Sequence, residues 1–367
     1  MIVVKQNKAY EFRLYPTQEQ EIIFTKTFGC VRFIYNQMLS DKIRYYQETK
    51  QKLNNTPAQY KQEFEWLKEV DSLALANAQM QLQSAYNSFF KRKDVGFPKF
   101  RSKKQDKDRY TTNNQNGSVA IIDNKVKLPK VGFVKAKVHR QIPSNQTIKS
   151  ATISRNAVGK YYISILVEYD YEPPIRELDK SKALGLDYSS PHFYVDSQGN
   201  EANYPKFYRN AEDKLVKEQR KLSNMKLGGN NYKKQKEVIA KLHEHVRNQR
   251  KDFLHKLSRE ITNNWDIVCV EDINLQSMAG SLHLGKSTND NGFGMFRTFL
   301  DYKLAEQGKL LVKIDRWFPS SKMCHCCGAI NQNLTLSDRE WDCECGAHLL
   351  RDINAAINIR EVGLNML

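Results

Sequence analysis

Residues 318–359 read FPSSKMCHCCGAINQNLTLSDREWDCECGAHLLRDINAAINI, and the rest of the chain can be understood outward from them. Two cysteine pairs lie here, Cys324 with Cys327 and Cys343 with Cys345, with fifteen residues between the pairs. A glycine follows each pair and supplies the tight backbone turn of a metal-binding knuckle. This spacing predicts a closed four-cysteine zinc ribbon in which Zn²⁺ is structural; a disulfide cluster is the alternative, and Cys326 is a spare thiol.

Composition points to a folded protein that binds nucleic acid. The chain has 367 residues, enough for about two or three domains. It carries 58 Lys and Arg against 41 Asp and Glu, a net charge of +17. This excess is spread along the chain rather than held in one tail. We therefore expect a nucleic-acid partner rather than a membrane, with a merely soluble basic protein as the alternative.

The sequence shows no sign of export or membrane insertion. No apolar run reaches the roughly 18 residues that a membrane span needs, and the first residues lack a signal-peptide layout. We expect a cytosolic protein with reduced cysteines. Outside the ribbon, Cys30 and Cys269 lie in apolar contexts and are predicted to be ordinary core residues.

The N-terminal half combines strand and helix patterns. Alternating residues predict a strand over 3–14, and helical spacing of apolar residues predicts helices over about 18–50 and 57–93. The basic segment 91–116, which contains aromatic residues, is either a nucleic-acid-binding loop or a solvated linker. Five short strand patterns within 118–169 predict a small antiparallel barrel, which the first strand completes.

After Pro173 and Pro174 the pattern changes to α/β. The apolar runs KALGLDYSS, WDIVCVEDINL and KLLVKID predict strands, and FYVDSQGN predicts the hairpin partner of the first one. Between them, a long basic helical stretch over about 203–264 is broken near Gly228 and Gly229. Such an alternation is typical of a mixed sheet covered by helices.

Three acids in this half are candidates for chemistry. Asp187 and Glu271 each end an apolar strand pattern, and Asp352 begins a helical pattern directly after the ribbon. If strand ends bring them together, cations must neutralise their charge. Hard carboxylate oxygens favour Mg²⁺ or Mn²⁺. Two such ions can activate water and stabilise the leaving 3′ oxygen of a phosphodiester.

Each acid taken alone also has an ordinary structural interpretation. An Asp at the end of a strand is commonly a turn former or helix cap, and Glu271 can simply pair with a lysine. Asp272 is a rival to Glu271, but successive strand residues point to opposite faces, so only one of them can join the cluster.

Several motifs together give the chain a family resemblance. GLD, then VED, then a four-cysteine ribbon running into RDINAAINI, resembles the transposon-encoded TnpB proteins, compact relatives of the type V CRISPR effector nucleases. The resemblance extends to FRLYPT, GFPKFRSKK, IKSATISR, KYYISILVE and QRKDFLHKLS, and so covers nearly the whole chain. It implies a multidomain α+β protein with a RuvC-type, RNase H-like nuclease domain and an inserted zinc ribbon. It also implies an N-terminal wedge-like β-barrel interrupted by a helical recognition block.

The resemblance assigns residues and domain bounds. It places the catalytic acids, as Mg²⁺ or Mn²⁺ ligands, at Asp187, Glu271 and Asp352. It places the zinc ligands at Cys324, Cys327, Cys343 and Cys345. The domains it implies are the first barrel strand over 1–15, the helical block over 16–93, the remaining barrel over 94–175, the nuclease domain over 176–317 and 348–367, and the zinc ribbon over 318–347.

The resemblance also implies the activity, an RNA-guided DNA endonuclease. A guide RNA from the transposon end pairs with a double-stranded DNA target beside a short motif that the protein reads. We expect a monomer with bound RNA in the prokaryotic cytosol or nucleoid. Two alternatives remain: a non-cleaving RNA-guided regulator, which intact acids disfavour, and a transposase or junction resolvase that needs no guide.

Overall fold

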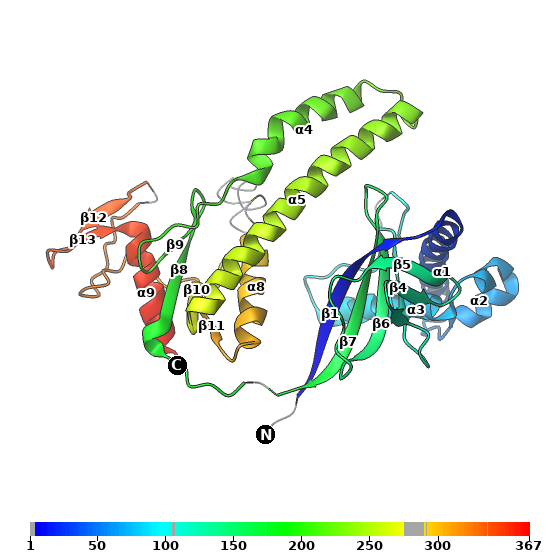
Figure 1. Cartoon of the computed structure of the whole chain (residues 1–367), viewed down its shortest axis with the longest axis horizontal. Helices are drawn as coiled ribbons and strands as arrows, with labels where there is room; N and C mark the ends of the chain where they lie inside the picture. Colours follow the sequence, from blue (N-terminus) through cyan, green and yellow to red (C-terminus); the bar gives the residue numbers. More distant parts are fainter. Residues whose placement is uncertain (1–3, 105–106, 173, 275–289, 291, 336) are drawn as a thin grey trace. The chain divides into compact units, whose positions relative to one another are not determined.

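The contacts of the chain divide it between Tyr171 and Glu172 into two units, each described by itself (Figure 1). The computed structural model describes residues 4–104, 107–172, 174–274, 290, 292–335 and 337–367. Within these residues, no helix combines the length and the apolar character that crossing a membrane requires.

The first unit contains a seven-stranded antiparallel sheet in the order β2-β6-β7-β1-β5-β4-β3. The expected first strand lies inside this sheet, because β1 pairs with β7 and with β5. The strands are β1 (Val4–Tyr15), β2 (Arg109–Asn113), β3 (Ala120–Ile122), β4 (Lys125–Leu128), β5 (Gly132–Lys137), β6 (Thr147–Arg155) and β7 (Tyr161–Tyr171).

A short connection shows that this sheet is strongly curled. Strands β2 and β3 follow each other in the chain but lie at opposite edges of the seven-stranded order. In a flat sheet, neighbours about 4.8 Å apart would separate these edges by roughly 29 Å. The chain from Asn113 to Ala120 can span roughly 25 Å at most. The two edges must therefore approach each other.

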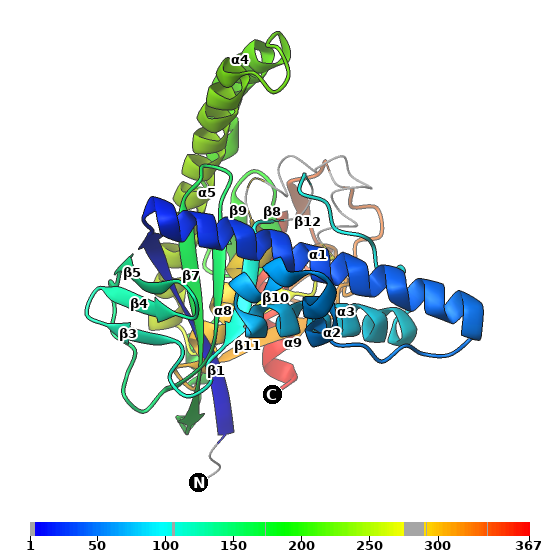
Figure 2. The same ribbon diagram turned by 90° about the vertical axis from the view of Figure 1, so that its right-hand side faces the viewer.

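Helices cover this sheet. The expected helical block forms α1 (Gln18–Thr49), α2 (Pro57–Glu63), the 3-10 helix η1 (Glu65–Glu69) and α3 (Ser72–Lys91). Figure 2 shows α1 lying across the strands. Its Phe24 ring lies 5.5 Å from that of Tyr161 and 6.3 Å from that of Tyr110, measured between centroids. The second predicted helix is broken because Asp71 caps a new one, its carboxylate accepting the backbone N–H of Leu73.

Strand β2 was not expected, because it lies in the basic segment interpreted as a loop or linker. Its Tyr110 and Thr112 side chains are buried, whereas the residues between and beside them are not. The hydroxyl of Thr112 donates to the carboxylate of Asp71. An alternation of apolar and polar residues over only five positions, flanked by polar sequence, is too short to predict a strand. The strand is stabilised by its tertiary contact with the start of α3.

The second unit contains a four-stranded mixed sheet in the order β11-β10-β8-β9. Strands β8, β10 and β11 are parallel, and β9 is antiparallel to β8. The elements are η2 (Lys180–Lys182), β8 (Ala183–Ser189), β9 (Phe193–Asp196), α4 (Phe207–Ser223), α5 (Asn230–Asn264), β10 (Ile267–Glu271), α8 (Phe293–Ala305), β11 (Leu310–Ile314), β12 (Glu340–Asp342), β13 (His348–Leu350) and α9 (Arg351–Asn365).

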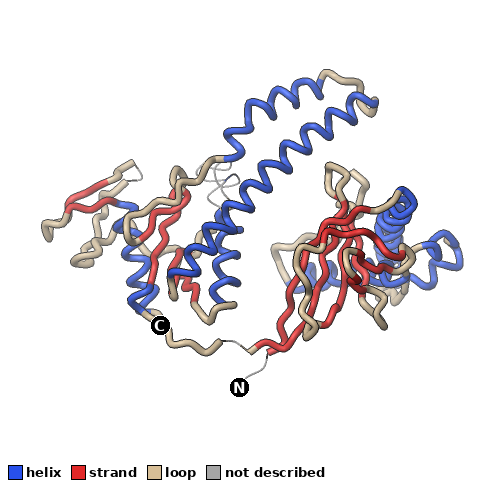
Figure 3. Tube along the Cα trace, in the orientation of Figure 1, coloured by secondary structure: helices blue, strands red, loops and turns tan. Residues whose placement is uncertain are grey.

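Helices lie on both faces of this sheet (Figure 3). Alternate residues of β8 and β10 point to opposite faces. Those that share a core with α5 and α8 are Leu184, Leu186, Val268 and Val270. Those that share a core with α9 are Ala183, Ile267 and Cys269. The same alternation places Asp187 and Glu271 on the α9 face.

Helix α9 approaches the sheet too closely for a side chain at two points. A Cβ atom at Gly185 of β8 would lie 2.0 Å from the carbonyl oxygen of Ala356. A Cβ atom at Gly363 of α9 would lie 2.4 Å from the sulfur of Cys269 on β10. Glycine at these positions lets the helix rest directly on both strands that carry the predicted acids.

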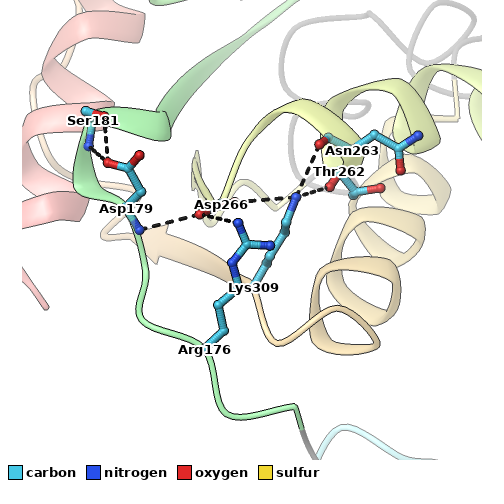
Figure 4. A network of polar contacts seen from close by, with 7 residues as sticks. All are labelled: Arg176, Asp179, Ser181, Thr262, Asn263, Asp266 and Lys309. Atoms are coloured by element: carbon cyan, nitrogen blue, oxygen red, sulfur yellow. Dashed lines mark hydrogen bonds and ion pairs between the residues drawn. The ribbon is translucent and has the colours of Figure 1, made fainter.

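A buried ionic network fixes the other end of the same strands (Figure 4). Asp266 is 1% exposed and accepts from Arg176 at 3.0 Å, with Lys309 at 3.4 Å. Lys309 donates to the carbonyl oxygens of Thr262, at 2.6 Å, and Asn263, at 3.4 Å, near the end of α5. Pairing of this kind is what allows a charge to be buried. The network joins the segment entering this unit to α5, β10 and β11.

Both cysteines outside the ribbon are core residues, as predicted. Cys30 and Cys269 are buried. Desolvation is the main cause that raises the pKa of Cys30 to about 11 and that of Cys269 to about 12. Their thiols are therefore protonated and unreactive at neutral pH.

The close packing of α9 gives a stability prediction. Gly185→Ala should lower the free energy of unfolding of the second unit by about 3 kcal/mol, the upper end of the usual range for overpacking, because the added methyl group meets backbone atoms. Gly29→Ala is the control, since nothing lies within 4 Å of the added group and alanine favours the helix by about 0.5–1 kcal/mol. Thermal unfolding of both full-length variants tests this. An unchanged transition in Gly185→Ala would contradict the packing.

Candidate active site and metal centre

Two neighbouring parallel strands bring Asp187 and Glu271 together. Leu186 of β8 is paired with Val270 of β10, and the two acids are the next residues along these strands. Neighbouring strands lie roughly 4.8 Å apart, and both acids belong to the α9 face. Asp352 is the second residue of α9, which packs on that face. All three predicted acids line a single cavity of about 850 Å³.

The cavity wall also carries positive charge. Four basic side chains line it together with the acids, and they are Arg316, Lys322, Arg339 and Arg351. Three of them come from the ribbon segment or its immediate flanks, and the fourth begins α9. A cavity with carboxylates at one place and basic side chains around them can bind a phosphate backbone and still attract metal ions to the carboxylates.

Burial raises the pKa of two of these acids, and at Asp187 the neighbouring acids raise it further. Desolvation, and then the charges of Glu271 and Asp352, raise the pKa of Asp187 well above its usual value, and Arg351 opposes this shift. Desolvation also raises the pKa of Glu271, against the hydrogen bond from Ser320. A bound cation reverses both effects, because it neutralises the crowded charge. The site therefore has the electrostatics of a cation site.

Glu271 and Asp272 are separated as the strand geometry predicts. The carboxylate of Glu271 accepts a hydrogen bond from the hydroxyl of Ser320 beside the cavity. Asp272 instead pairs with Arg316 at 2.9 Å and with Arg297 at 3.7 Å, and its side chain is 46% exposed. Asp272 is not among the residues that line the cavity. Of these two neighbours, Glu271 is the one that joins the cluster.

Asp352 is held by its own neighbour. The Nε and Nη2 atoms of Arg351 both lie 2.9 Å from one oxygen of Asp352. Nη1 of Arg351 donates to the carbonyl oxygen of Asp338 at 3.0 Å. The backbone N–H of Arg351 donates to the carbonyl oxygen of Arg339 at 2.8 Å. Arg351 thus orients Asp352 and ties the start of α9 to the ribbon.

The four predicted cysteines form a cluster suited to a metal ion. The sulfurs of Cys324, Cys327, Cys343 and Cys345 all lie within 4.8 Å of one another. The sulfurs of Cys324 and Cys345 are 3.8 Å apart, and those of Cys327 and Cys343 are 3.5 Å apart. A tetrahedral ion with metal–sulfur bonds of about 2.3 Å holds its sulfurs about 3.8 Å apart. All seven cysteines are free thiols, so the disulfide alternative is not what this fold contains.

The knuckle backbone favours ionised sulfur. Gly328 and Gly346 have φ values of +79° and +88°, the left-handed turns expected after each cysteine pair. Burial opposes ionisation of the Cys324 thiol, but the backbone N–H groups of Cys327 and Cys326, with hydrogen bonds from the Cys343 and Cys327 side chains, outweigh it and lower its pKa to about 6. Backbone hydrogen bonds lower the pKa of Cys327 and Cys343, but burial and the neighbouring cysteines outweigh them and raise it, so Cys324 is the thiol that ionises first without a metal ion. The spare Cys326 is exposed and contacts His325 at 3.4 Å, outside the cluster.

Three buried polar residues near the acids were not anticipated from the sequence. They are Ser320, Asn354 and Asn358. A weak signal for the last two exists in RDINAAINI, since asparagines four positions apart on an otherwise apolar helix must find partners on the same face. Nothing in the sequence marks Ser320, because its role depends on the tertiary contact with Glu271.

Three family profiles match the chain. The OrfB_IS605 family, described as a probable transposase, matches residues 164–282. The Cas12f1-like TNB domain matches residues 293–359, which include the cysteine cluster and Asp352. A helix-turn-helix domain matches residues 1–51. In this structure the described part of that last range contains strand β1 followed by the single long helix α1.

Curated relatives match along most of the chain. A Streptomyces pristinaespiralis protein named as an RNA-guided DNA endonuclease is 32% identical over 97% of this chain and 89% of its own length. Escherichia coli K12 InsQ, named in the same way, is 28% identical over 98% of this chain and 93% of its own length. The CRISPR-associated endodeoxyribonuclease Cas12f1 of Sulfoacidibacillus thermotolerans is 27% identical over 58% of this chain and 53% of its own length.

A solved structure supports the fold. A chain of a Cas12f1–sgRNA–target DNA complex matches with a TM-score of 0.60 at 13% identity, over 98% of this chain and 99% of that one. The likeness shows that the two chains share a fold in which helices combine with β-sheets. Because the transposase profile matches and a relative is 32% identical over 97% of this chain, the chain belongs to the transposon-encoded TnpB family of RNA-guided DNA endonucleases.

Proposed function

We propose that this chain is a transposon-associated RNA-guided DNA endonuclease that hydrolyses phosphodiester bonds in the cavity lined by Asp187, Glu271 and Asp352. The observation that carries the proposal is the convergence of these acids, from β8, β10 and α9, in one cavity with basic walls. Relatives named as RNA-guided DNA endonucleases support the same activity here. A guide RNA from the transposon end pairs with a double-stranded DNA target beside a short motif read by the protein.

The acids suit two Mg²⁺ or Mn²⁺ ions. Asp187 interacts with both other acids, which favours it as the ligand shared by two ions. Two divalent cations held by these residues would supply an activated water and neutralise the charge on the leaving 3′ oxygen.

The residues of the chain orient these ligands and the substrate. Arg351 engages one oxygen of Asp352, so the other oxygen is the one offered to a cation. Arg316, Lys322 and Arg339 on the cavity wall attract the phosphate backbone of the strand to be cut. These side chains can hold the phosphates that flank the scissile phosphate while it lies against the acids.

The finer architecture is part of this proposal. A mixed sheet with carboxylates at the ends of its strands supports a RuvC-type, RNase H-like domain, and the curled seven-stranded sheet supports a wedge-like barrel. The inserted helices would form the recognition block, and Zn²⁺ is the ion assigned to the cysteines. The bounds are 1–15 and 94–175 for the barrel, 16–93 for the helical block, 176–317 and 348–367 for the nuclease domain, and 318–347 for the zinc ribbon.

The partners follow from the same activity. A net charge of +17 spread over the chain suits binding of an RNA–DNA heteroduplex through its backbone and shape. We propose that the protein acts as a monomer with guide RNA in the prokaryotic cytosol or nucleoid.

Co-expression with the neighbouring DNA tests the function. The protein should purify with a defined RNA, and this complex should cut matched duplex DNA when Mg²⁺ is added. Asp187→Asn should keep the RNA, but its cleavage rate should fall by more than about 100-fold. A fall of about 100-fold is the most that usually follows loss of a residue that only hydrogen-bonds to a metal ligand, and Asp187 is proposed to be a ligand itself. Asp272→Asn, a neighbouring acid outside the cavity, is the matched control and should still cut.

Each failure has a different meaning. Bound RNA without cutting by the wild type would favour the non-cleaving regulator. Retained cutting in Asp187→Asn would overturn the metal assignment. Absence of bound RNA would overturn RNA guidance.

The raised pKa of Asp187 gives a stability prediction. A carboxyl group whose folded pKa lies above its unfolded pKa destabilises the fold as pH rises through the unfolded value. Without Mg²⁺ at neutral pH, Asp187→Asn should therefore melt at a higher temperature than the wild type, and the difference should vanish below about pH 4. A lower melting temperature for Asp187→Asn at neutral pH would mean that this carboxylate is a structural group.

The ribbon gives a metal-content prediction. Cys343→Ser should lose bound zinc and soluble yield, because a structural site contributes directly to folding. Cys326→Ser is the matched control: it removes a thiol from the other knuckle of the same ribbon, outside the cluster, and should keep the wild-type zinc content. Elemental analysis of the purified proteins gives the answer. Full zinc in Cys343→Ser would rule out the four-cysteine assignment.

A further inference from the structure

Ser320 links the candidate active site to the ribbon. Its side chain is buried, and its hydroxyl donates to the carboxylate of Glu271. Its carbonyl oxygen accepts the amide group of Asn358 on α9 at 2.8 Å. One serine therefore contacts the acid with its side chain and α9 with its backbone. A carboxylate oriented by such a donor has fewer accessible rotamers. Binding a cation therefore costs less conformational entropy, because the carboxylate is already ordered.

Two asparagines on α9 continue this chain of contacts into the metal knuckle. Asn354 and Asn358 are four residues apart, so they lie on one face of the helix. Both donate to the carbonyl oxygen of Met323, at 2.7 and 2.6 Å. The side-chain oxygen of Asn354 accepts the backbone N–H of His325 at 3.0 Å. Met323 and His325 flank Cys324, so the backbone on both sides of this cysteine is clamped to α9.

We propose that Ser320 is a positioning residue for Glu271, and that Asn354 and Asn358 make this positioning depend on the four-cysteine cluster. A filled cluster fixes the knuckle backbone, the asparagines fix α9 and the turn at Ser320 against it, and the serine hydroxyl fixes the carboxylate of Glu271. The inference rests on the proposed function, because it concerns cation binding at the same acids.

The asparagines are committed to this clamp by their burial. They are 1% and 2% exposed, and a buried amide left without partners carries a cost that water cannot relieve. If the knuckle unfolds, the amide groups of both residues lose the Met323 carbonyl together. The amide group of Asn358 donates to the carbonyl oxygens of both Ser320 and Met323. When Asn358 moves, Ser320 therefore loses its fixed position. The two metal sites are therefore coupled, and coupling between binding sites is reciprocal.

The first experiment isolates the contact between Ser320 and Glu271. Mn²⁺ binding to the zinc-loaded protein is titrated for the wild type, Ser320→Ala, Glu271→Gln and the double variant, and the active-site component is defined by its loss in Asp187→Asn. Ser320→Ala should weaken Mn²⁺ binding about 10-fold or more. In the Glu271→Gln background it should have almost no further effect, because the two residues act through one contact.

Ser258→Ala is the matched control for loss of a buried hydroxyl. Ser258 is 0% exposed and donates to the carbonyl oxygen of Leu254 within α5. Its loss should lower the melting temperature without changing Mn²⁺ affinity. Equal effects of Ser320→Ala in both backgrounds would overturn the positioning role. If the wild type and Asp187→Asn bind Mn²⁺ alike, the proposed metal site itself fails, and that result is distinct from a failure of Ser320.

The second experiment measures the coupling. Zinc affinity is determined by competition with a zinc-selective chelator, with and without saturating Mg²⁺. In the wild type, Mg²⁺ should tighten zinc binding about fivefold or more, and this effect should disappear in Asn358→Ala. Asn365→Ala, at an exposed asparagine of the same helix, should keep it. A wild type that binds Mg²⁺ at the acids but shows the same zinc affinity in both conditions would overturn the coupling.

Discussion

The contact between α9 and the strands beneath it is the constraint on which the candidate site depends. Asp187 and Glu271 are brought together by the pairing of β8 with β10, but Asp352 belongs to a helix that follows the ribbon. Only the direct approach of α9, made possible by glycine at 185 and 363, places this third acid at the same sheet edge. Any side chain at these points would displace the helix, and the acid with it.

That placement is electrostatically unfavourable in the metal-free fold. Three carboxylates share one cavity, and burial together with mutual repulsion raises the pKa of Asp187. Arg351 relieves part of this repulsion, and Ser320 supplies a donor to Glu271. The packing of α9 and the buried network around Asp266 must therefore hold the strands in place against the repulsion. Sites of this kind release their strain when cations bind, which ties folding stability to the function.

Much of this arrangement follows from local sequence patterns. The strands that carry Asp187 and Glu271, the cysteine cluster and the helix after it could all be predicted, because each depends on a short periodicity or a fixed ligand spacing. Alternation along a strand also predicts that only one of Glu271 and Asp272 lines the cavity, and the family resemblance selected Glu271. The family resemblance supplied what the periodicities alone did not, namely the expectation that these acids act as a set.

The elements that sequence patterns missed are those completed by tertiary contacts. Strand β2 is recognisable only in the folded protein, where the hydroxyl of Thr112 donates to the carboxylate of Asp71, the residue that caps α3. Helix α8 was absent from the expected elements, although its Phe293 and Phe296 form much of the core beneath β8. Ser320 is one of two adjacent serines in a turn, and no pattern distinguishes them. Its importance appears only when its hydroxyl is seen at Glu271 and its carbonyl at Asn358.

The order of elements explains why a metal ribbon stands at this point of the chain. It is the connection between β11 and α9, so its fold determines where the helix carrying Asp352 begins. Its own core is small, formed by Leu334, Trp341 and Leu349 with two of the cysteines. A core of this size needs a metal ion to fold stably. The bonds from Arg351 to Asp338 and Arg339 then transmit that order to the first turn of α9. An ion held by the cysteines would thus determine the position of an acid that it does not contact.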